Sequence, residues 1–265
     1  MKRGMEGVAK TIALSWRLFA AAVGARYRNA FLGYFWMVCP AVLITGGVSL
    51  ASQSGVINPG NTRLPYPLFV FLGVIVWQVF AEAVKVPHVA FDGARAYLTK
   101  VHFAHEALIL AQLYESLIGV FVRFTAVLLL VAWYGESSWR GIGLLALCLA
   151  GSNLLGLGLG AMLMPFTMLF ADLQNAVKLI LGYGLFLTPA FYVPESAGLL
   201  SSLVQSAPVA PLMNSARDAA AGAALSQPDA LAAVLALSLL MTMAGMAFVR
   251  LSAPIVIERL LLGGR

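Results

Sequence analysis

Long segments without charge constrain this chain more than any other feature of its sequence. Residues 31–52 contain no Asp, Glu, Lys or Arg. A helix of about twenty apolar residues is long enough to cross the hydrocarbon core of a bilayer. The whole chain is 61% hydrophobic and only 11% charged, whereas soluble domains have roughly 25% charged residues. These features predict a protein embedded in a membrane.

Six segments of bilayer length follow one another along the chain. They are residues 31–52, 67–86, 109–134, 141–169, 176–193 and 230–251. Only helices and closed barrels satisfy their backbone groups in lipid, and these segments do not alternate as barrel strands do. The sequence therefore predicts an all-α polytopic membrane protein with a six-helix transmembrane domain over 31–251. An interface segment over 1–30 precedes it, and a tail over 252–265 follows.

Lys and Arg give this arrangement an orientation. Thirteen of them fall in the predicted inner segments: Lys2, Arg3, Lys10, Arg17, Arg26, Arg28, Lys85, Arg95, Lys100, Lys178, Arg250, Arg259 and Arg265. The outer loops hold three: Arg63, Arg140 and Arg217. This positive-inside asymmetry predicts that both termini are cytoplasmic. The first thirty residues lack the pattern of a signal peptide, an unbroken apolar region followed by a small-residue cleavage site.

A short amphipathic helix is predicted just before the first span. Its apolar positions recur at helical spacing, at Ile12, Trp16, Phe19 and Val23, while Lys10 and Arg17 fall on another side. Such a helix is typical of the inner membrane interface, where it contacts lipid. The pattern alone fits equally well a plain anchor without a mechanical role.

Two glycine-containing strings resemble nucleotide-binding motifs without their required context. Residues 4–11 nearly fit a phosphate-binding loop, but Ala9 replaces its second glycine and only three residues precede it. Residues 156–161 fit a dinucleotide fingerprint but lie inside an apolar run, without the ribose-binding acidic residue. Gly156 and Gly160 instead suggest close helix packing in the membrane. We therefore expect this chain to bind no cofactor.

No pattern of catalytic or metal-binding residues stands out. His88, His102 and His105 cluster between the second and third spans without a further ligand at metal spacing, so a solvated helix is favoured over a metal site. Cys39 and Cys148 both lie in apolar runs and are predicted to be buried small residues. The basic residues are scattered between apolar segments rather than gathered on one face, which argues against nucleic acid. The sequence predicts that the chain is not an enzyme.

Several segments resemble, in order and spacing, the ABC-2 type permeases. The entry to the first span resembles that family in Arg26-Tyr27-Arg28, Leu32-Gly33, Trp36 and Pro40. Three further matches are "YPLFVFLGVIVWQVFAEAV" in the second span, "LTKVHFAHEALILAQLYESLI" in the following inner passage, and "TPAFYVPES" with "APVAPLMNSARDA" near the outer side. The resemblance is strongest to the branch that exports polysaccharides such as O-antigen, capsule or teichoic acid. Ala104, His105, Val76 and Ala171 depart from the family pattern.

The resemblance implies an assembly and a function. Family members are homodimers bound to two separate ATPase subunits, which hold ATP and magnesium. The implied function is therefore a non-enzymatic permease subunit that exports a lipid-linked polysaccharide through the bacterial inner membrane, with O-antigen first and capsule second. The resemblance also implies re-entrant outer helices over 194–229, between the fifth and sixth spans.

The resemblance also assigns roles to two groups of residues. The inner loop over 87–106 is the implied ATPase-coupling segment, with Phe91, Asp92, Arg95, Tyr97, Lys100, His105 and Glu106 as its candidate contacts. Its mixture of charged and apolar residues suits a groove on a partner protein, although a solvated loop helix is the alternative. The implied interface helix and gate comprise Trp16, Arg17, Arg26, Tyr27 and Arg28.

Aromatic residues near the span ends are candidates for the translocation path. Sugars are bound by aromatic faces with a few polar groups, and the candidates are Tyr34, Trp36, Trp77, Tyr114, Tyr183, Phe191 and Tyr192. Most membrane aromatics belong instead to interfacial belts or helix packing. Arg123 is a further candidate, since it is a charged residue deep in a span. It either binds phosphate groups of the substrate or pairs with a carboxylate such as Glu115 or Glu82.

Three other functions remain open from the sequence. An exporter of a drug or small lipid is the alternative within the same family. A secondary transporter or channel needs intramembrane carboxylates, whereas Glu82, Glu115 and Asp172 fall near the predicted inner ends of spans. A membrane scaffold without transport is the third alternative.

Overall fold

The computed structural model describes residues 35–56, 62–98, 105–134, 139–192 and 204–262, with Ser15, Trp16, Phe19 and Gly60 in addition. These residues form helices and no strands. The helices are α2 (Phe35–Gln53), α3 (Tyr66–Leu98), α4 (His105–Tyr134), α5 (Trp139–Leu169), α6 (Ala171–Tyr183), the 3₁₀ helix η1 (Gly184–Leu187), α8 (Ala210–Ala220) and α9 (Pro228–Leu262). The all-α prediction is confirmed for this part of the chain.

Five of the described helices are long and apolar enough to cross a membrane. Their candidate spans are Phe35–Gln53, Tyr66–Gly93, Ile109–Tyr134, Trp139–Leu169 and Pro228–Val256. Each overlaps one of the predicted segments, and most of them differ from it at the ends. The chain is thus a multi-pass membrane protein, as the composition indicated.

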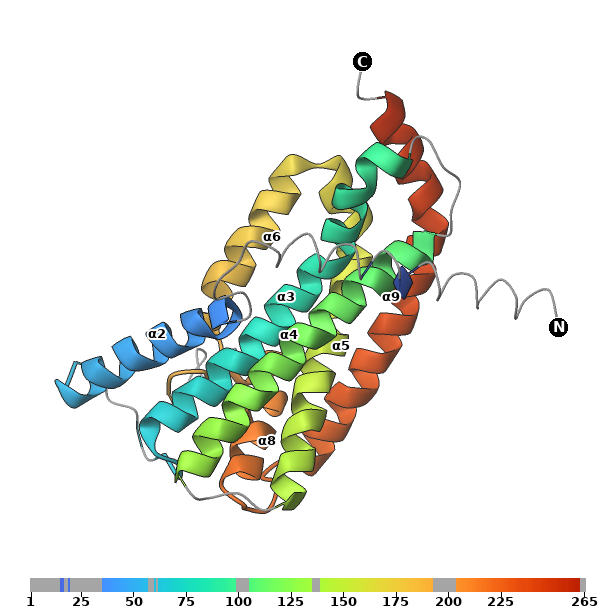
Figure 1. Ribbon diagram of the computed structural model, residues 1–265. Helices are drawn as coiled ribbons and strands as arrows, with labels where there is room; N and C mark the ends of the chain where they lie inside the picture. The colour runs from blue at the N-terminus through green and yellow to red at the C-terminus, as the bar shows by residue number, and fades with distance from the viewer. Residues whose placement is uncertain are drawn as a thin grey trace.

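The predicted crossing at 176–193 corresponds to a shorter, broken element. α6 has 13 residues and η1 has 4, which together rise about 28 Å, close to the thickness of the hydrocarbon core. α5 ends at the upper end of the bundle in Figure 1 and α9 begins at the lower end, so the chain returns between them through α6, η1 and α8. A sixth crossing here, and a re-entrant course of the outer region, stay predictions.

Two helices extend beyond the ends that the sequence predicted. α3 continues through Pro87 to Leu98, so the first part of the predicted loop 87–106 is a continuation of the second span. A proline is tolerated in a membrane helix where neighbouring helices accommodate the break. α9 likewise continues from the last span to Leu262, through most of the predicted tail. Residues 99–104 lie outside the described part.

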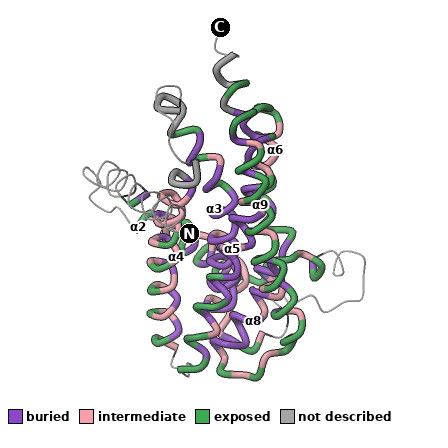
Figure 2. Tube along the Cα trace, turned by 90° about the vertical axis from the view of Figure 1, so that its right-hand side faces the viewer, coloured by how far each residue is buried: buried purple, intermediate pink, exposed green. Residues whose placement is uncertain are grey.

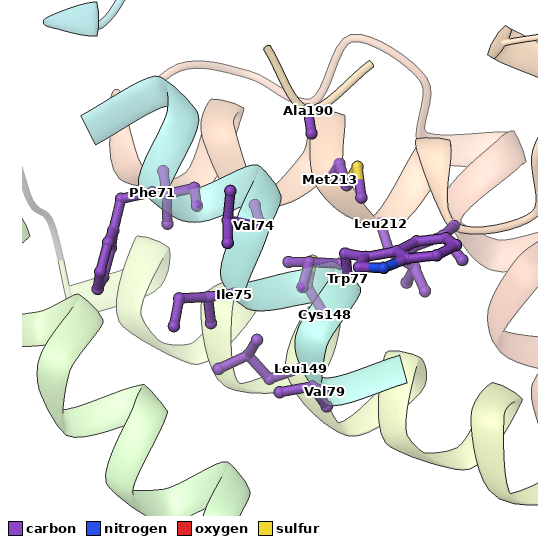
Figure 3. Packing of buried hydrophobic residues seen from close by; sticks show 14 of the residues in the cluster. Phe71, Val74, Ile75, Trp77, Val79, Cys148, Leu149, Ala190, Leu212 and Met213 are labelled. Carbon is purple, nitrogen blue, oxygen red and sulfur yellow. The ribbon is translucent and has the colours of Figure 1, made fainter. Parts of the chain in front are cut away.

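α3 is the central helix of the bundle. In an 18-residue apolar window of its candidate span 83% of the residues are buried, against 22% for α4 and 17% for α2, and Figure 2 shows this difference. Its apolar side chains meet those of α5 and α8 in the core shown in Figure 3: Phe71, Val74, Ile75, Trp77 and Val79 from α3, Cys148 and Leu149 from α5, and Leu212 and Met213 from α8. Cys148 is buried as predicted, but Cys39 on α2 is only partly buried.

Glycines allow α5 to approach α3 closely. A Cβ atom on Gly156 would lie 2.4 Å from the carbonyl oxygen of Phe80, and one on Gly160 would lie 2.1 Å from that of Val84. Both distances are too short for any side chain, so these two glycines set the contact between α5 and α3. The structure thus confirms the packing role predicted for them.

Candidate functional site

One exposed face of α3 carries charged residues. Glu82, Lys85, Val89 and Asp92 are exposed, whereas almost every other described residue of this helix is buried. Their spacings of three and four residues place them on a single face, which we call the α3 stripe. Charged side chains of membrane helices almost always face a protein neighbour or a water-filled cavity. The α3 stripe is therefore expected to face water or protein rather than lipid.

Two grooves flank the α3 stripe, and Lys85 and Val89 line both. The groove on the α4 side has a volume of about 180 Å³, and its polar lining residues are Glu82, Lys85, Gln112, Glu115 and Ser116. The groove on the α6 side has a volume of about 190 Å³, and its polar lining residues are Lys85, His88, Asp92, Thr167, Gln174 and Lys178. The helices α2 and α6 both lie to the left of α3 in Figure 1, and in Figure 2 they lie on opposite sides of it.

An ion pair with one buried partner joins α4 to the α3 stripe. Arg123 donates a hydrogen bond from Nη2 to a carboxylate oxygen of Glu82. The Arg123 side chain is 2% exposed, whereas that of Glu82 is 49% exposed. Among the described residues, Nε of Arg123 has no hydrogen-bond partner. The pairing with Glu82 that the sequence left open is therefore present.

Further hydrogen bonds extend this polar network along α4. Gln112 Nε2 donates to a carboxylate oxygen of the buried Glu115 at 3.0 Å. Asn153 of α5 donates from Nδ2 to Ser116 Oγ at 2.7 Å. Gln112, Glu115 and Ser116, which line the α4-side groove, thus have hydrogen-bond partners within α4 or on α5, and without partners these buried or partly buried polar groups would cost free energy.

His88 links three helices at the α6-side groove. Gln174 Nε2 of α6 lies 2.7 Å from His88 Nε2, and Thr167 Oγ1 of α5 lies 3.0 Å from His88 Nδ1. Since the amide nitrogen is a donor, Nε2 accepts and Nδ1 carries the hydrogen, as in a neutral imidazole. Thr167 in turn donates to the carbonyl of Met164. Both ring nitrogens thus have protein partners, which does not favour a metal-ligand role for His88.

A third cavity lies at the opposite end of the bundle, where α3 begins and α8 is placed. It has a volume of about 280 Å³. Its polar lining residues are Arg63, Tyr192, Gln205, Asn214, Arg217, Asp218, Ser226 and Gln227. We call it the outer cavity, because the distribution of Lys and Arg predicts that this end is outside.

Arg217 of α8 forms the floor of the outer cavity. Its Nη2 donates to the carbonyl of Ala190 at 2.9 Å, its Nε donates to that of Phe69 at 3.3 Å, and its guanidinium lies 3.5 Å from the centroid of the Phe69 ring. Burial lowers the pKa of Arg217 to about 9, with the neighbouring Asp218 opposing this effect. The guanidinium therefore stays charged at neutral pH and fastens α8 to α3.

The predicted path aromatics are distributed among different environments. Trp77 and Phe191 are buried in the core, and Trp77 Nε1 donates to the carbonyl of Leu181 at 3.1 Å. Trp36 of α2 and Tyr183 of α6 are 63% and 68% exposed. Tyr192 is partly buried in the lining of the outer cavity.

Tyr114 contacts the described part of the predicted interface helix. The rings of Trp16 and Phe19 lie 6.1 Å and 5.8 Å from the ring of Tyr114, which places this segment beside α4. Tyr34, Arg17, Arg26, Tyr27 and Arg28 lie outside the described residues.

The predicted coupling residues are described only in part. Phe91 is fully buried, so it packs within the bundle, while Asp92 is exposed at the end of the α3 stripe. Arg95 and Tyr97 belong to the last turns of α3, and His105 and Glu106 begin α4, but the structure does not describe these four side chains. Lys100 lies outside the described residues.

The sequence analysis did not predict that Lys85 is exposed between two grooves or that Arg217 is buried at the outer cavity. Lys85 lies three residues after Glu82 and seven before Asp92, a spacing that signals one polar helix face. Arg217 was counted only as an outer-loop charge, and nothing in its neighbourhood signals that it is buried.

The described fold and site are those of a polytopic α-helical membrane protein with a charged face between its helices. No profile of a known protein family matches the chain. The chain is 28% identical over 169 residues to the O-antigen export system permease protein RfbA of Myxococcus xanthus. The alignment covers 63% of this chain and 64% of that relative. This similarity supports the resemblance to ABC-2 type permeases.

Proposed function

We propose that this chain is the permease subunit of an ABC-2 type exporter that moves a lipid-linked polysaccharide across the bacterial inner membrane. The observation that carries the proposal is the similarity to an O-antigen export permease over 63% of the chain. O-antigen is therefore the first candidate cargo and capsule the second. ATP and magnesium bind to a separate ATPase subunit in this proposal, and two copies of each subunit form the exporter.

The α3 stripe supports a translocation path on this face of the subunit. Charged side chains within a membrane protein face a wet cavity or a protein neighbour, and Lys85 is exposed between two grooves. Trp36 and Tyr183 add exposed aromatic rings on α2 and α6. One subunit of this size is too small to enclose a polymer, so we place the path between two copies of the chain.

The proposal is tested by deleting the gene in its native bacterium. We expect surface polysaccharide to be lost and its lipid-linked precursor to accumulate on the cytoplasmic side, with both restored by the wild-type chain. Native mass spectrometry of the solubilised complex should give two permease and two ATPase subunits. Unchanged surface polysaccharide in the deletion strain contradicts the proposed cargo, and a monomer that retains full transport contradicts the assembly.

An exporter of a drug or small lipid is a second candidate. The α6-side groove favours it, because the apolar residues Val84, Val89, Leu163, Val177 and Leu181 contribute to its lining, as is typical of sites for apolar ligands. In the deletion experiment this function gives normal surface polysaccharide together with increased sensitivity to, or retention of, an apolar compound.

A further inference from the structure

The outer cavity contains polar groups that neighbouring residues orient and that are able to form hydrogen bonds to a ligand. Arg217 Nη1 lies 3.4 Å from Asn214 Oδ1, which orients the amide so that its NH₂ group remains a donor. Asp218 Oδ2 accepts hydrogen bonds from the backbone nitrogen and the hydroxyl of Ser226 at 2.7 Å and 2.6 Å. Asp218 lines the same cavity, and its second carboxylate oxygen, Oδ1, is also an acceptor. The floor of the cavity thus presents a fixed donor beside a fixed acceptor.

The rim of the cavity adds adaptable polar groups. Gln205, Gln227 and Arg63 are exposed and line the cavity. Tyr192 contributes a partly buried aromatic ring. Amides and a guanidinium offer several donors and acceptors in planar arrangements, and a ring offers a face to C–H groups.

These groups suit neighbouring hydroxyl groups better than an anion or an acyl chain. The guanidinium of Arg217 is already engaged with two carbonyls, and the Asp218 carboxylate lines the same cavity, where it would repel a phosphate. An acyl chain would leave the polar groups without partners, which costs free energy. The volume of about 280 Å³ lies near the lower end of ligand pockets, about 300–1,000 Å³, and so fits a small polar ligand.

We infer that the outer cavity binds one sugar residue of a glycan through its hydroxyl groups. Asn214 and Asp218 provide the fixed donor and acceptor, Gln205, Gln227 and Arg63 close over the ring, and Tyr192 lies against a C–H face. This inference rests on the proposed function for the orientation of the chain and for its glycan cargo. It adds a glycan contact at the end of the subunit where the cargo leaves.

The inference is tested by sugar binding to the full-length chain in lipid nanodiscs. The probes are the methyl glycosides of mannose, glucose and galactose, detected by saturation-transfer NMR. The double variant Gln205→Leu/Gln227→Leu removes two exposed amides, and we expect about tenfold weaker binding from the loss of two hydrogen bonds. Gln53→Leu, an exposed amide at the end of α2 outside the cavity, is the matched control and should bind as the wild type does.

Three results overturn the inference: none of the glycosides binds, the double variant binds as tightly as the wild type, or inorganic phosphate displaces the glycosides. Circular dichroism of both variants shows that any loss is not due to unfolding. Polysaccharide export in the complemented deletion strain separates this inference from the proposed function. Normal export without glycoside binding contradicts only the cavity, whereas amide-dependent binding without any export contradicts only the proposed function.

Discussion

Arg123 on α4 and Glu82 on α3 form an ion pair in which one partner is buried and the other is half-exposed. The pair is therefore asymmetric. A carboxylate without its partner is still able to reach water from the α3 stripe, but a guanidinium without its partner remains enclosed. Because the exposed fractions of the two side chains are 2% and 49%, substituting one partner should change stability by a different amount from substituting the other.

The first prediction follows from this asymmetry. Glu82→Leu should destabilise the protein by about 3–5 kcal/mol, because it leaves a buried charge unpaired, whereas Arg123→Met should destabilise it less. The double variant should recover much of the loss. Thermal unfolding in detergent measures the order of stability of these variants. Phe121→Leu, at an exposed position of α4, is the control. Equal losses for both single variants would contradict the asymmetry.

The second prediction concerns the contact between α5 and α3. Gly160→Ala places a methyl group 2.1 Å from the carbonyl oxygen of Val84, so the helices must separate, at a cost of about 1–3 kcal/mol. Gly143→Ala on the same helix meets no atom within 4 Å and should be neutral or slightly stabilising. The melting temperatures of the two variants test this difference, and an equal effect of both substitutions would refute the packing role.

The third prediction concerns Arg217. Arg217→Met removes the charged donor from the carbonyls of Phe69 and Ala190, and each lost hydrogen bond from a charged group costs about 1.5–3 kcal/mol. Arg140→Met, an exposed arginine at the same end of the bundle, should change stability little. Since the pKa of Arg217 stays at about 9, the folded and unfolded chains are both charged below that value, and the difference should be the same at pH 6 and pH 8. If Arg217→Met lowers the stability no more than Arg140→Met does, the hydrogen bonds of Arg217 contribute nothing to stability.

The fourth prediction depends on the proposed function. Charge reversal of Arg95 and Lys100 together should weaken association with the ATPase subunit without changing membrane insertion, because both lie in the predicted coupling segment. Co-purification of the ATPase measures this effect. Charge reversal of Arg259, exposed near the end of α9, is the control. If the ATPase co-purifies unchanged, the segment is better described as a solvated loop.

The membrane-spanning helices were predictable because hydropathy and length act within one segment. The predicted segment 109–134 lies within α4, His105–Tyr134, and the spacing of Gly156 and Gly160 alone predicts their packing role. Helix ends were less predictable. Nothing in the local sequence shows that α3 continues past Pro87, since the neighbouring helices determine how a proline is accommodated.

The sequence by itself determined the class of protein, its helices and the asymmetry of its charges, because these depend on residues that are close along the chain. The tertiary structure decided which charges meet. Glu82 and Arg123 are 41 positions apart, and Arg217 is 148 positions from Phe69. These contacts depend on which helix faces pack together. The sequence does not show this, because the charged residues that form contacts and those that do not are surrounded by similar apolar residues. The α3 stripe and the outer cavity are therefore properties of the folded bundle.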